Sequence, residues 1–180
     1  QAKRAGGNCV ERYSSDINTA AVERLMLKSK LRRAFEREEL RLHYQPKYSL
    51  ETGRVEGAEA LVRWNLPERG LVYPSDFIPL AEETNLILQV GDWVLNRVCE
   101  DYRLWQRSLP SPGRISVNLS LKQLRQQKFL ERVRTVFKLH GVSPTCLELE
   151  ITETTLMDDA DRTIKILDAL YGMGLHLAID

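Results

Sequence analysis

The second half of the chain alternates short apolar runs with longer segments of helical periodicity. The apolar runs are Ile115–Leu119, Leu147–Ile151 and Leu175–Ile179, and the segments 121–140 and 159–173 lie between them. Short apolar strands that alternate with helices of this length are typical of βαβ units and a parallel sheet. An open doubly wound sheet and a (β/α) barrel both fit this pattern.

The first half has a different organisation. Apolar residues recur at roughly helical spacing over 19–39, with charged residues on the other sides. Segment 40–50 alternates loosely, 51–54 has the composition of a tight turn, and 55–64 is apolar again, so we predict an antiparallel hairpin. Elsewhere the pattern predicts a short strand at 9–13, a loop at 67–74, and helices at 75–83 and 86–107.

One carboxylate interrupts the second strand of the predicted hairpin. Glu59 lies in the middle of the stretch VEGAEALVRW, and nothing beside it in the sequence neutralises it. A lone ionised carboxylate in apolar surroundings costs several kcal/mol or more. Glu59 therefore requires a partner from elsewhere in the chain.

The three later strands each end on an oxygen-bearing side chain. These residues are Asn118, Glu150 and Asp180, at intervals of 32 and 30 residues. Equivalent positions on neighbouring parallel strands lie side by side, and the carboxyl ends of such strands form the active-site edge of barrels and open α/β sheets. Glu59, on the preceding strand, can reach the same edge. The four side chains form an all-oxygen set that favours Mg²⁺, Mn²⁺ or Ca²⁺ over zinc, so we predict a metal site there.

A simpler interpretation exists for each of these residues. Acidic residues at strand ends often cap the following helix, and Asp180 or Glu153 would suit that role. For any one residue taken alone, a structural role is the better interpretation. Four donors in register, with Glu59 inside a strand, favour the metal.

Composition and charge narrow the class of protein. The chain has 180 residues, of which 43% are apolar and 28% charged, and its net charge is +1. These values predict a globular domain, or part of a larger one, with no general attraction for DNA or anionic membranes. Cys9, Cys99 and Cys146 lack metal-binding spacing and indicate a reducing, cytoplasmic compartment. No apolar run approaches the ~18 residues of a membrane span, so we expect no membrane contact from this segment; an upstream inner-membrane anchor is compatible with this.

Several segments together resemble the EAL domain, the family of cyclic-di-GMP phosphodiesterases of bacterial signal transduction. Glu59-Ala60-Leu61 matches the signature tripeptide. The segments LRLHYQPKYSLETGRVEGAEALVRW, YPSDFIPLAEETNLI, ISVNLS and LELEITET follow in the family's order and spacing, and the final LAID resembles the start of its Asp-Asp-Phe-Gly segment. The resemblance covers residues 31–180. It implies an α/β fold, a (β/α)8 TIM-type barrel with one antiparallel strand, incomplete in this chain.

The resemblance also implies a metal centre. Glu59, Asn118, Glu150 and Asp180 match the ligands of one ion, Mg²⁺ or Mn²⁺, with Asp180 bridging to a second. Glu59 and Glu153 are the catalytic candidates, because Glu153 matches the acidic residue that steadies the loop after the Asp-Asp pair. Two metal ions roughly 3.5–4 Å apart would activate a water for hydrolysis of one 3′–5′ phosphodiester of cyclic di-GMP, giving linear pGpG.

A second group of residues matches positions that contact the cyclic dinucleotide: Gln45, Leu61 and Arg63. The Arg63 guanidinium suits a phosphodiester because it donates a planar fork of hydrogen bonds to phosphate oxygens. A surface ion pair is the alternative role for Arg63.

The family's site has further members that would follow Asp180: the second Asp of the pair, a Lys and a Glu. We therefore expect the isolated chain to be inactive and the complete protein to be a phosphodiesterase. The alternative is a catalytically inactive EAL module that binds cyclic di-GMP as a receptor. Such modules usually lose metal ligands, and none is lost here. A protein that acts only through dimerisation, using apolar positions such as Leu25 and Leu31, is a further alternative.

The first residues resemble the end of a different domain. The stretch AKRAGGNCVERY is similar to the closing strand of a GGDEF (diguanylate cyclase) domain. We predict a GGDEF tail at 1–16, a connector helix at 17–39 and the N-terminal part of an EAL domain at 40–180, in a protein that forms a homodimer. An ordinary amphipathic helix is the alternative for the connector.

Overall fold

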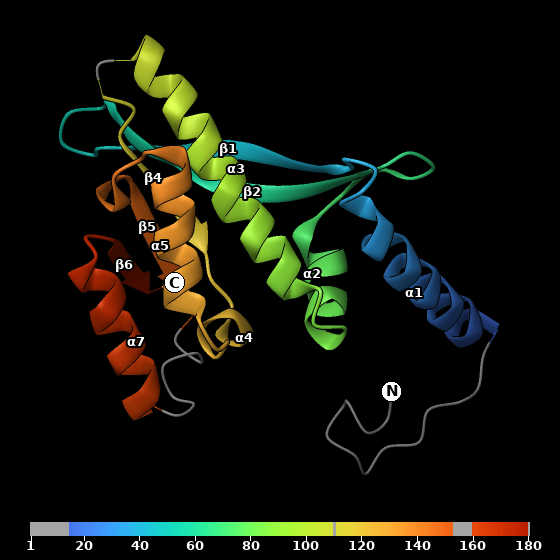
Figure 1. Cartoon of the computed structure of the whole chain (residues 1–180). Helices are drawn as coiled ribbons and strands as arrows, with labels where there is room; N and C mark the ends of the chain where they lie inside the picture. The colour runs from blue at the N-terminus through green and yellow to red at the C-terminus, as the bar shows by residue number, and fades with distance from the viewer. Residues whose placement is uncertain (1–14, 110, 153–159, 180) are drawn as a thin grey trace.

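The computed structural model describes residues 15–109, 111–152 and 160–179 (Figure 1). The predicted strand at 9–13 lies outside these residues. The helices are α1 (Ser15–Ala34), α2 (Pro74–Glu83), α3 (Ile87–Ser108), α4 (Leu121–Leu124), α5 (Phe129–His140) and α7 (Ala160–Gly172), with a 3-10 turn η1 (Pro144–Cys146). The strands are β1 (Leu40–Tyr48), β2 (Val55–Leu66), β3 (Gly70–Val72), β4 (Arg114–Asn118), β5 (Leu147–Ile151) and β6 (His176–Ile179).

These strands form one mixed sheet in the order β1-β2-β4-β5-β6, with β3 paired to β2. β1 and β2 are antiparallel, whereas β2, β4, β5 and β6 are parallel. The hairpin turn contains Gly53 at a φ of 66°, a conformation that glycine adopts without steric cost. The predicted hairpin and the parallel βαβ order are confirmed. Within the described residues the sheet is open, with β1 and β6 at its edges.

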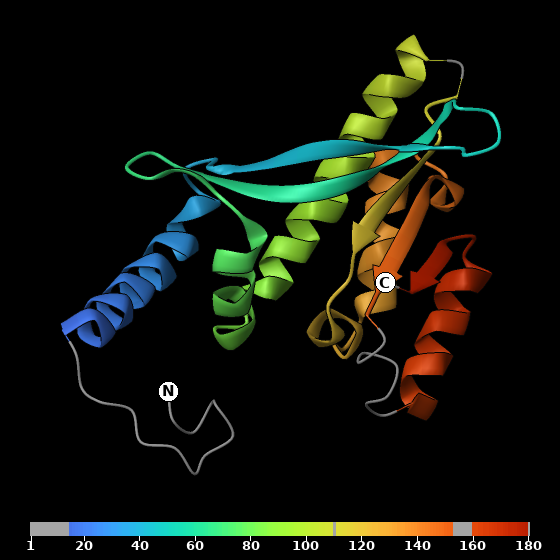
Figure 2. The same cartoon turned by 180° about the vertical axis from the view of Figure 1, so that it is seen from behind.

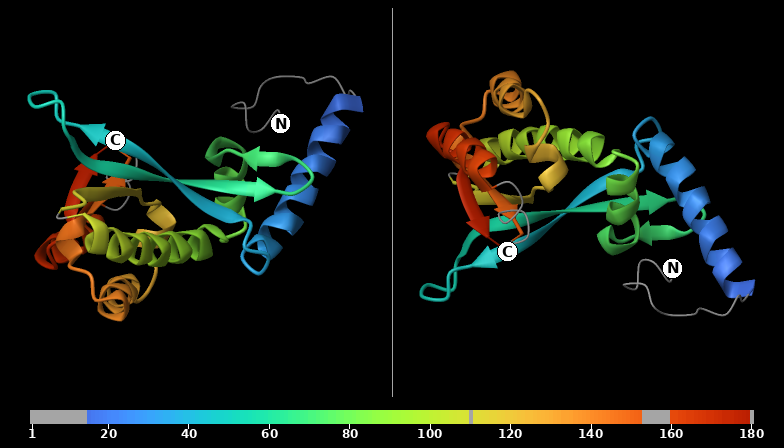
Figure 3. Two further views of the ribbon diagram at one scale, coloured as in Figure 1. Left: turned by 90° about the horizontal axis from the view of Figure 1, so that it is seen from above. Right: turned by 90° about the horizontal axis from the view of Figure 1, so that it is seen from below.

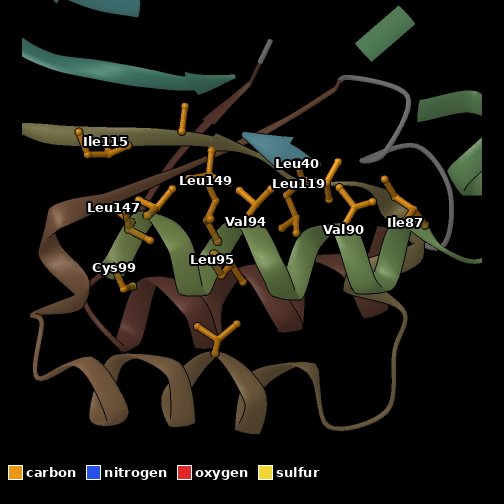
Figure 4. Packing of buried hydrophobic residues seen from close by; sticks show 14 of the residues in the cluster. Leu40, Ile87, Val90, Val94, Leu95, Cys99, Ile115, Leu119, Leu147 and Leu149 are labelled. Carbon is orange, nitrogen blue, oxygen red and sulfur yellow. The ribbon is translucent and has the colours of Figure 1, made fainter. Parts of the chain in front are cut away.

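The hydrophobic core lies between the sheet and helix α3. Figure 1 shows α3 running along one face of the sheet with α5 beside it, and Figure 2 shows the face that these helices leave uncovered. Val94 of α3 packs near Leu147 and Leu149 of β5, all of them buried (Figure 4). Burial of one such side chain contributes about 1.5–3 kcal/mol. Because successive strand residues point to opposite faces, this packing turns Glu148 and Glu150 toward the uncovered face.

Helix α1 lies against α2, at the far end of the molecule from α7 (Figure 3). Leu31 is fully buried there, whereas Leu25 is 65% exposed. An ion pair joins the two helices, with Lys28 Nζ 2.8 Å from Glu83 Oε2. The helix ends at Ala34, before the expected position near 39, because the chain turns into β1 through Glu38 at a φ of 52°.

Two local predictions were wrong. The segment predicted as one helix over 121–140 forms α4 and α5, because Lys128 adopts a left-handed φ of 66° between them. The predicted loop at 67–74 contains the short strand β3, in which Leu71 pairs with Asn65 of β2. Both features depend on contacts with other segments, which local periodicity does not report. In the described part of the chain, no helix combines the length and the apolar character needed to cross a membrane.

Candidate functional site

The β1–β2 hairpin carries several predicted site residues on one face. Its register pairs Gln45 with Glu59 and His43 with Leu61, and directly opposed residues of an antiparallel pair project to the same side. Arg63 follows Leu61 by two positions and shares this face. Glu59, Leu61 and Arg63 are half-buried, and Gln45 is exposed. The hairpin therefore presents both the predicted catalytic carboxylate and the predicted dinucleotide contacts on the uncovered side of the sheet.

The ends of β4 and β5 bring two further predicted donors to the same place. Asn118 pairs in register with Glu150, and Asn118 Nδ2 donates a hydrogen bond to Glu59 Oε1 at 2.8 Å. The structure thus gathers three of the four predicted metal ligands on one face of the sheet, with Asn118 and Glu150 near the carboxyl ends of β4 and β5 and Glu59 within β2. The fourth, Asp180, and the catalytic candidate Glu153 lie outside the described residues.

Glu59 has a hydrogen-bond partner within the chain, and the predicted shared cation stays a prediction. Its surroundings are less apolar than the sequence suggested, because Glu59 is half-buried on the uncovered face and accepts a hydrogen bond from Asn118. A carboxylate that keeps part of its hydration avoids most of the penalty for burial. Glu59 is therefore tolerated without a metal, and its need for a partner is not evidence for one.

Arg63 lies beside an aromatic ring. Its Nη1 donates to the Val62 carbonyl oxygen at 2.9 Å, and its Cζ lies 5.4 Å from the centroid of the Tyr73 ring. A guanidinium in this position gains a cation–π attraction. Neither contact uses a carboxylate, and among the residues that the structure describes Arg63 forms no ion pair of the kind considered as its alternative role.

A cavity of about 540 Å³ adjoins the candidate site. Glu59, Asn118 and Glu150 contribute polar groups to its lining. Most of the remaining wall is apolar and includes Leu61, Val62, Ile78, Pro79 and Val90. A concave, mainly apolar space with a few converging polar groups is the usual form of a site for small organic ligands.

The donor set fits a hard divalent cation in part. Glu59 and Glu150 supply carboxylate oxygens, and Asn118 would supply its amide oxygen after a half-turn of the amide group. Oxygen ligands of this kind suit Mg²⁺ and Mn²⁺. Among the residues that the structure describes, no three His, Cys, Asp or Glu side chains form a group able to hold a metal ion. The described residues therefore supply only part of a metal site.

Comparison with known proteins identifies the family. Residues 28–180 match the EAL domain family. The chain belongs to the EAL domain family. This match confirms the resemblance inferred from the motifs, whereas the roles of the site residues stay predictions. The GGDEF tail, the connector and the domain limits stay predictions.

Curated relatives of this EAL-family chain are much longer proteins. It is 43% identical over 179 residues to the bifunctional diguanylate cyclase/cyclic di-GMP phosphodiesterase MucR of Pseudomonas aeruginosa, covering 99% of this chain and 26% of MucR. It is 38% identical over 180 residues to the cyclic di-GMP phosphodiesterase NbdA of the same organism, covering all of this chain and 23% of NbdA. The chain thus spans about a quarter of these relatives.

The fold is also shared with a solved structure. The structure described as the PaMucR phosphodiesterase in complex with c-di-GMP superposes with a TM-score of 0.83 at 44% identity, over 86% of this chain and 63% of that one. EAL domains of known structure are TIM-like barrels. The predicted α/β barrel-type fold with an antiparallel first strand is therefore confirmed.

The sequence-based interpretation missed a charged cluster beneath the three donors. Lys47 Nζ lies 2.7 Å from Glu150 Oε1 and 3.0 Å from Glu148 Oε1, and it also contacts Ser116 Oγ. Partial burial lowers the pKa of Lys47, but the hydrogen bonds to Glu150 and Glu148 outweigh it, so the pKa lies above its ordinary value. Burial acts to raise the pKa of Glu148, but the hydrogen bonds from Ser116 and Lys47 hold it below its usual range. The signal was present as alternate polar residues in LHYQPKY, RISVN and LELEI.

A capped helix fixes the loop that follows Asn118. Ser120 caps α4 by a capping box, in which Gln123 N donates to Ser120 Oγ at 3.4 Å and Ser120 N donates to Gln123 Oε1 at 3.1 Å. Gln123 is buried against Gly91 of α3, where an added Cβ would lie 1.8 Å from its Nε2. The absence of a side chain at Gly91 of α3 therefore leaves room for Gln123 to cap α4, and this cap fixes the chain that follows β4.

Proposed function

We propose that this EAL-family chain contributes part of a bacterial signalling enzyme that hydrolyses cyclic di-GMP to linear pGpG. The observation that carries the proposal is the hydrogen bond from Asn118 to Glu59, with Glu150 in register beside Asn118. The position of Asn118 and Glu150 near the carboxyl ends of β4 and β5, where barrel enzymes carry their chemistry, supports the proposal. The names of MucR and NbdA, which describe cyclic-di-GMP phosphodiesterases, support the same substrate.

The proposed cofactor is Mg²⁺ or Mn²⁺. Glu59, Asn118 and Glu150 would hold it, with Asp180 as the fourth proposed ligand and Glu153 steadying the neighbouring loop. When bound, a pair of such ions activates water and neutralises charge on the phosphate. The oxygen-only chemistry of the described donors supports this choice over zinc.

The remaining groups of the chain bind and orient the dinucleotide in this proposal. Arg63 donates its fork of N–H groups to a phosphate, and its position beside Tyr73 restricts the guanidinium before the ligand arrives. Gln45 and Leu61 contact the nucleotide from the same face of the hairpin.

The test uses the full-length protein that contains this chain. Purified protein with Mg²⁺ or Mn²⁺ should convert cyclic di-GMP to pGpG. Liquid chromatography of the reaction mixture measures the product. Glu59→Gln should abolish the conversion, whereas Glu56→Gln, an exposed position on the same strand, should leave it unchanged. Binding of cyclic di-GMP by calorimetry without any product would reject the enzyme and identify a receptor. Absence of both binding and product would reject the family's ligand for this protein.

The organisation of the complete protein is a separate proposal. We place a GGDEF tail at 1–16, a connector at 17–39 and the EAL part from 40 onward, in a cytoplasmic homodimer. The alignment with MucR, a bifunctional diguanylate cyclase/cyclic di-GMP phosphodiesterase, covers 99% of this chain. This relationship supports an adjoining cyclase domain. Sedimentation of the full-length protein at several concentrations tests the dimer, and a monomer at all of them would reject it.

A further inference from the structure

Lys47 crosses the uncovered face of the sheet and ends among three acceptors. Its ammonium donates to Glu150 Oε1 at 2.7 Å and Glu148 Oε1 at 3.0 Å, and to Ser116 Oγ. An ammonium group has three N–H donors, so this cluster uses all of them. The acceptors come from β4 and β5, while Lys47 belongs to β1. Lys47 is thus tied to two strands that do not pair with its own.

A glycine on the intervening strand leaves room for this crossing. Gly57 of β2 pairs in register with Lys47 on one side and with Arg114 on the other. It has no side chain to stand between Lys47 and β4. An added Cβ at Gly57 would lie 2.1 Å from the Arg114 carbonyl oxygen, so the backbone geometry excludes every larger residue.

The two carboxylates that accept hydrogen bonds from Lys47, Glu148 and Glu150, are called here the inner pair. The outer set is the group of proposed metal ligands Glu59, Asn118 and Glu150, so Glu150 belongs to both. Glu148 and Glu150 are two residues apart on β5, so their side chains project to the same face. Ser116 Oγ donates to Glu148 Oε1 at 2.7 Å and adds a hydroxyl to the group. Two carboxylates and a hydroxyl are also a ligand set for a hard divalent cation. Without the ammonium, this inner pair would repel itself and attract any cation available.

We propose that Lys47 is a positioning residue, a built-in counter-ion that fills the inner Glu148–Glu150 pair and thereby directs the divalent metal to the outer set. The inference rests on the metal centre of the proposed function. Lys47 engages Oε1 of Glu150, which leaves the Oε2 atom for the outer ion. The Glu150 side chain is only 11% exposed, so a fixed ammonium beside it restricts its rotamer as well as its charge. Lys47 would thus set both the place and the number of the bound ions.

The test counts metal ions on the full-length protein without nucleotide. Equilibrium dialysis against Mn²⁺ should show that Lys47→Met binds one more ion per chain than the wild type. Adding Glu148→Gln to Lys47→Met removes one carboxylate of the inner pair and should return the count to the wild-type value. Lys30→Met is the matched control, because Lys30 Nζ has an exposed partner, Glu68, at 3.0 Å on the surface, and this change should not alter the count.

Two outcomes would overturn the proposal: equal Mn²⁺ counts for Lys47→Met and the wild type, or an extra ion that persists in the double variant. Circular dichroism in the presence of a metal chelator measures whether each variant is folded without bound metal. If Lys47→Met unfolds there, added Mn²⁺ should restore the native spectrum, and failure to do so also overturns the proposal. A wild-type protein that binds no Mn²⁺ would reject the outer metal centre of the proposed function, whereas a gained ion in Lys47→Met would still support the counter-ion.

Discussion

Asn118 and Glu59 are joined by a 2.8 Å hydrogen bond although 59 residues separate them in the chain. The bond connects Glu59, in the middle of β2, with Asn118, at the end of β4, on the uncovered face of the sheet. In a family whose proposed chemistry needs oxygen ligands at this edge, a neutral amide beside the carboxylate has an advantage. It adds a ligand without adding a further negative charge to those of Glu59 and Glu150.

Loss of the Asn118 amide should affect metal binding more than folding. Asn118 is exposed, so Asn118→Ala should lower the free energy of unfolding by no more than about 1 kcal/mol. The affinity for Mn²⁺ should fall about tenfold or more, equivalent to ~1.4 kcal/mol. Calorimetric titration of the full-length protein with Mn²⁺ measures the change. Asn65→Ala, at an exposed position on β2, is the control, and an equal loss of affinity in both variants would refute a ligand role for Asn118.

Alanine at Gly91 should disturb the loop that carries Asn118. Its Cβ would lie 1.8 Å from Gln123 Nε2, so Gln123 must leave its buried position and the capping box of α4. The loss of the cap should lower the free energy of unfolding by about 1–2 kcal/mol. Urea titration followed by circular dichroism measures this difference.

Gly172→Ala is the matched control for Gly91→Ala. Nothing lies within 4 Å of the Cβ that it would add at the end of α7. Because alanine favours a helix over glycine by up to about 1 kcal/mol, this variant should be neutral or slightly more stable. Equal destabilisation by both substitutions would contradict the proposed role of Gly91.

Cys99 and Cys146 should be poorly reactive in the folded protein. Burial raises the pKa of each thiol to about 12, so the reactive thiolate is scarce near neutral pH. Iodoacetamide at pH 8 should therefore label both residues slowly in the native state and rapidly in denaturant, as measured by mass spectrometry of the peptides. Rapid native labelling of either residue would contradict its burial.

The same thiols predict how stability depends on pH. Their pKa values are raised by folding, so their contribution is fully present below the ordinary pKa of 9.0 and is lost as the pH rises toward about 12. The free energy of unfolding should fall over this interval. In a Cys99→Ala/Cys146→Ala variant the slope should be shallower; an unchanged slope would assign the effect to other groups.

Tyr44 should stabilise the contact between β1 and α3. Its hydroxyl donates to Asp101 Oδ2 at 2.7 Å, and burial together with this bond raises the pKa of Tyr44. Tyr44→Phe should lower the free energy of unfolding by about 1–2 kcal/mol, because the buried Asp101 loses one partner but keeps Arg97 at 2.8 Å. Thermal unfolding measures the loss. Tyr48→Phe, at a tyrosine that is 60% exposed, should be neutral, and equal effects would argue against the bond.

Much of the sheet could be predicted from local pattern. The run LELEI predicted a strand over Leu147–Ile151, which is the observed β5, because apolar residues at every second position bury one face. The position of Glu150 and Asn118 at the ends of successive strands, 32 residues apart, predicted that they would share an edge, and the parallel register confirms it. Lys128 had no such signal. It precedes α5 as the N-cap residue, in a left-handed conformation although it is neither glycine nor asparagine, so its position depends on packing.

The sequence by itself determined which residues carry oxygen donors and at which ends of strands they stand, because side-chain alternation and strand length are local properties. Only the tertiary structure decided which groups those donors meet. Glu59 meets Asn118 rather than an isolated apolar environment, and Glu150 meets Lys47, which lies 103 residues earlier in the chain. Both pairings depend on the order of the strands, and that of Lys47 depends also on the room left by Gly57 on β2; neither feature is encoded in the neighbourhood of the residues that pair.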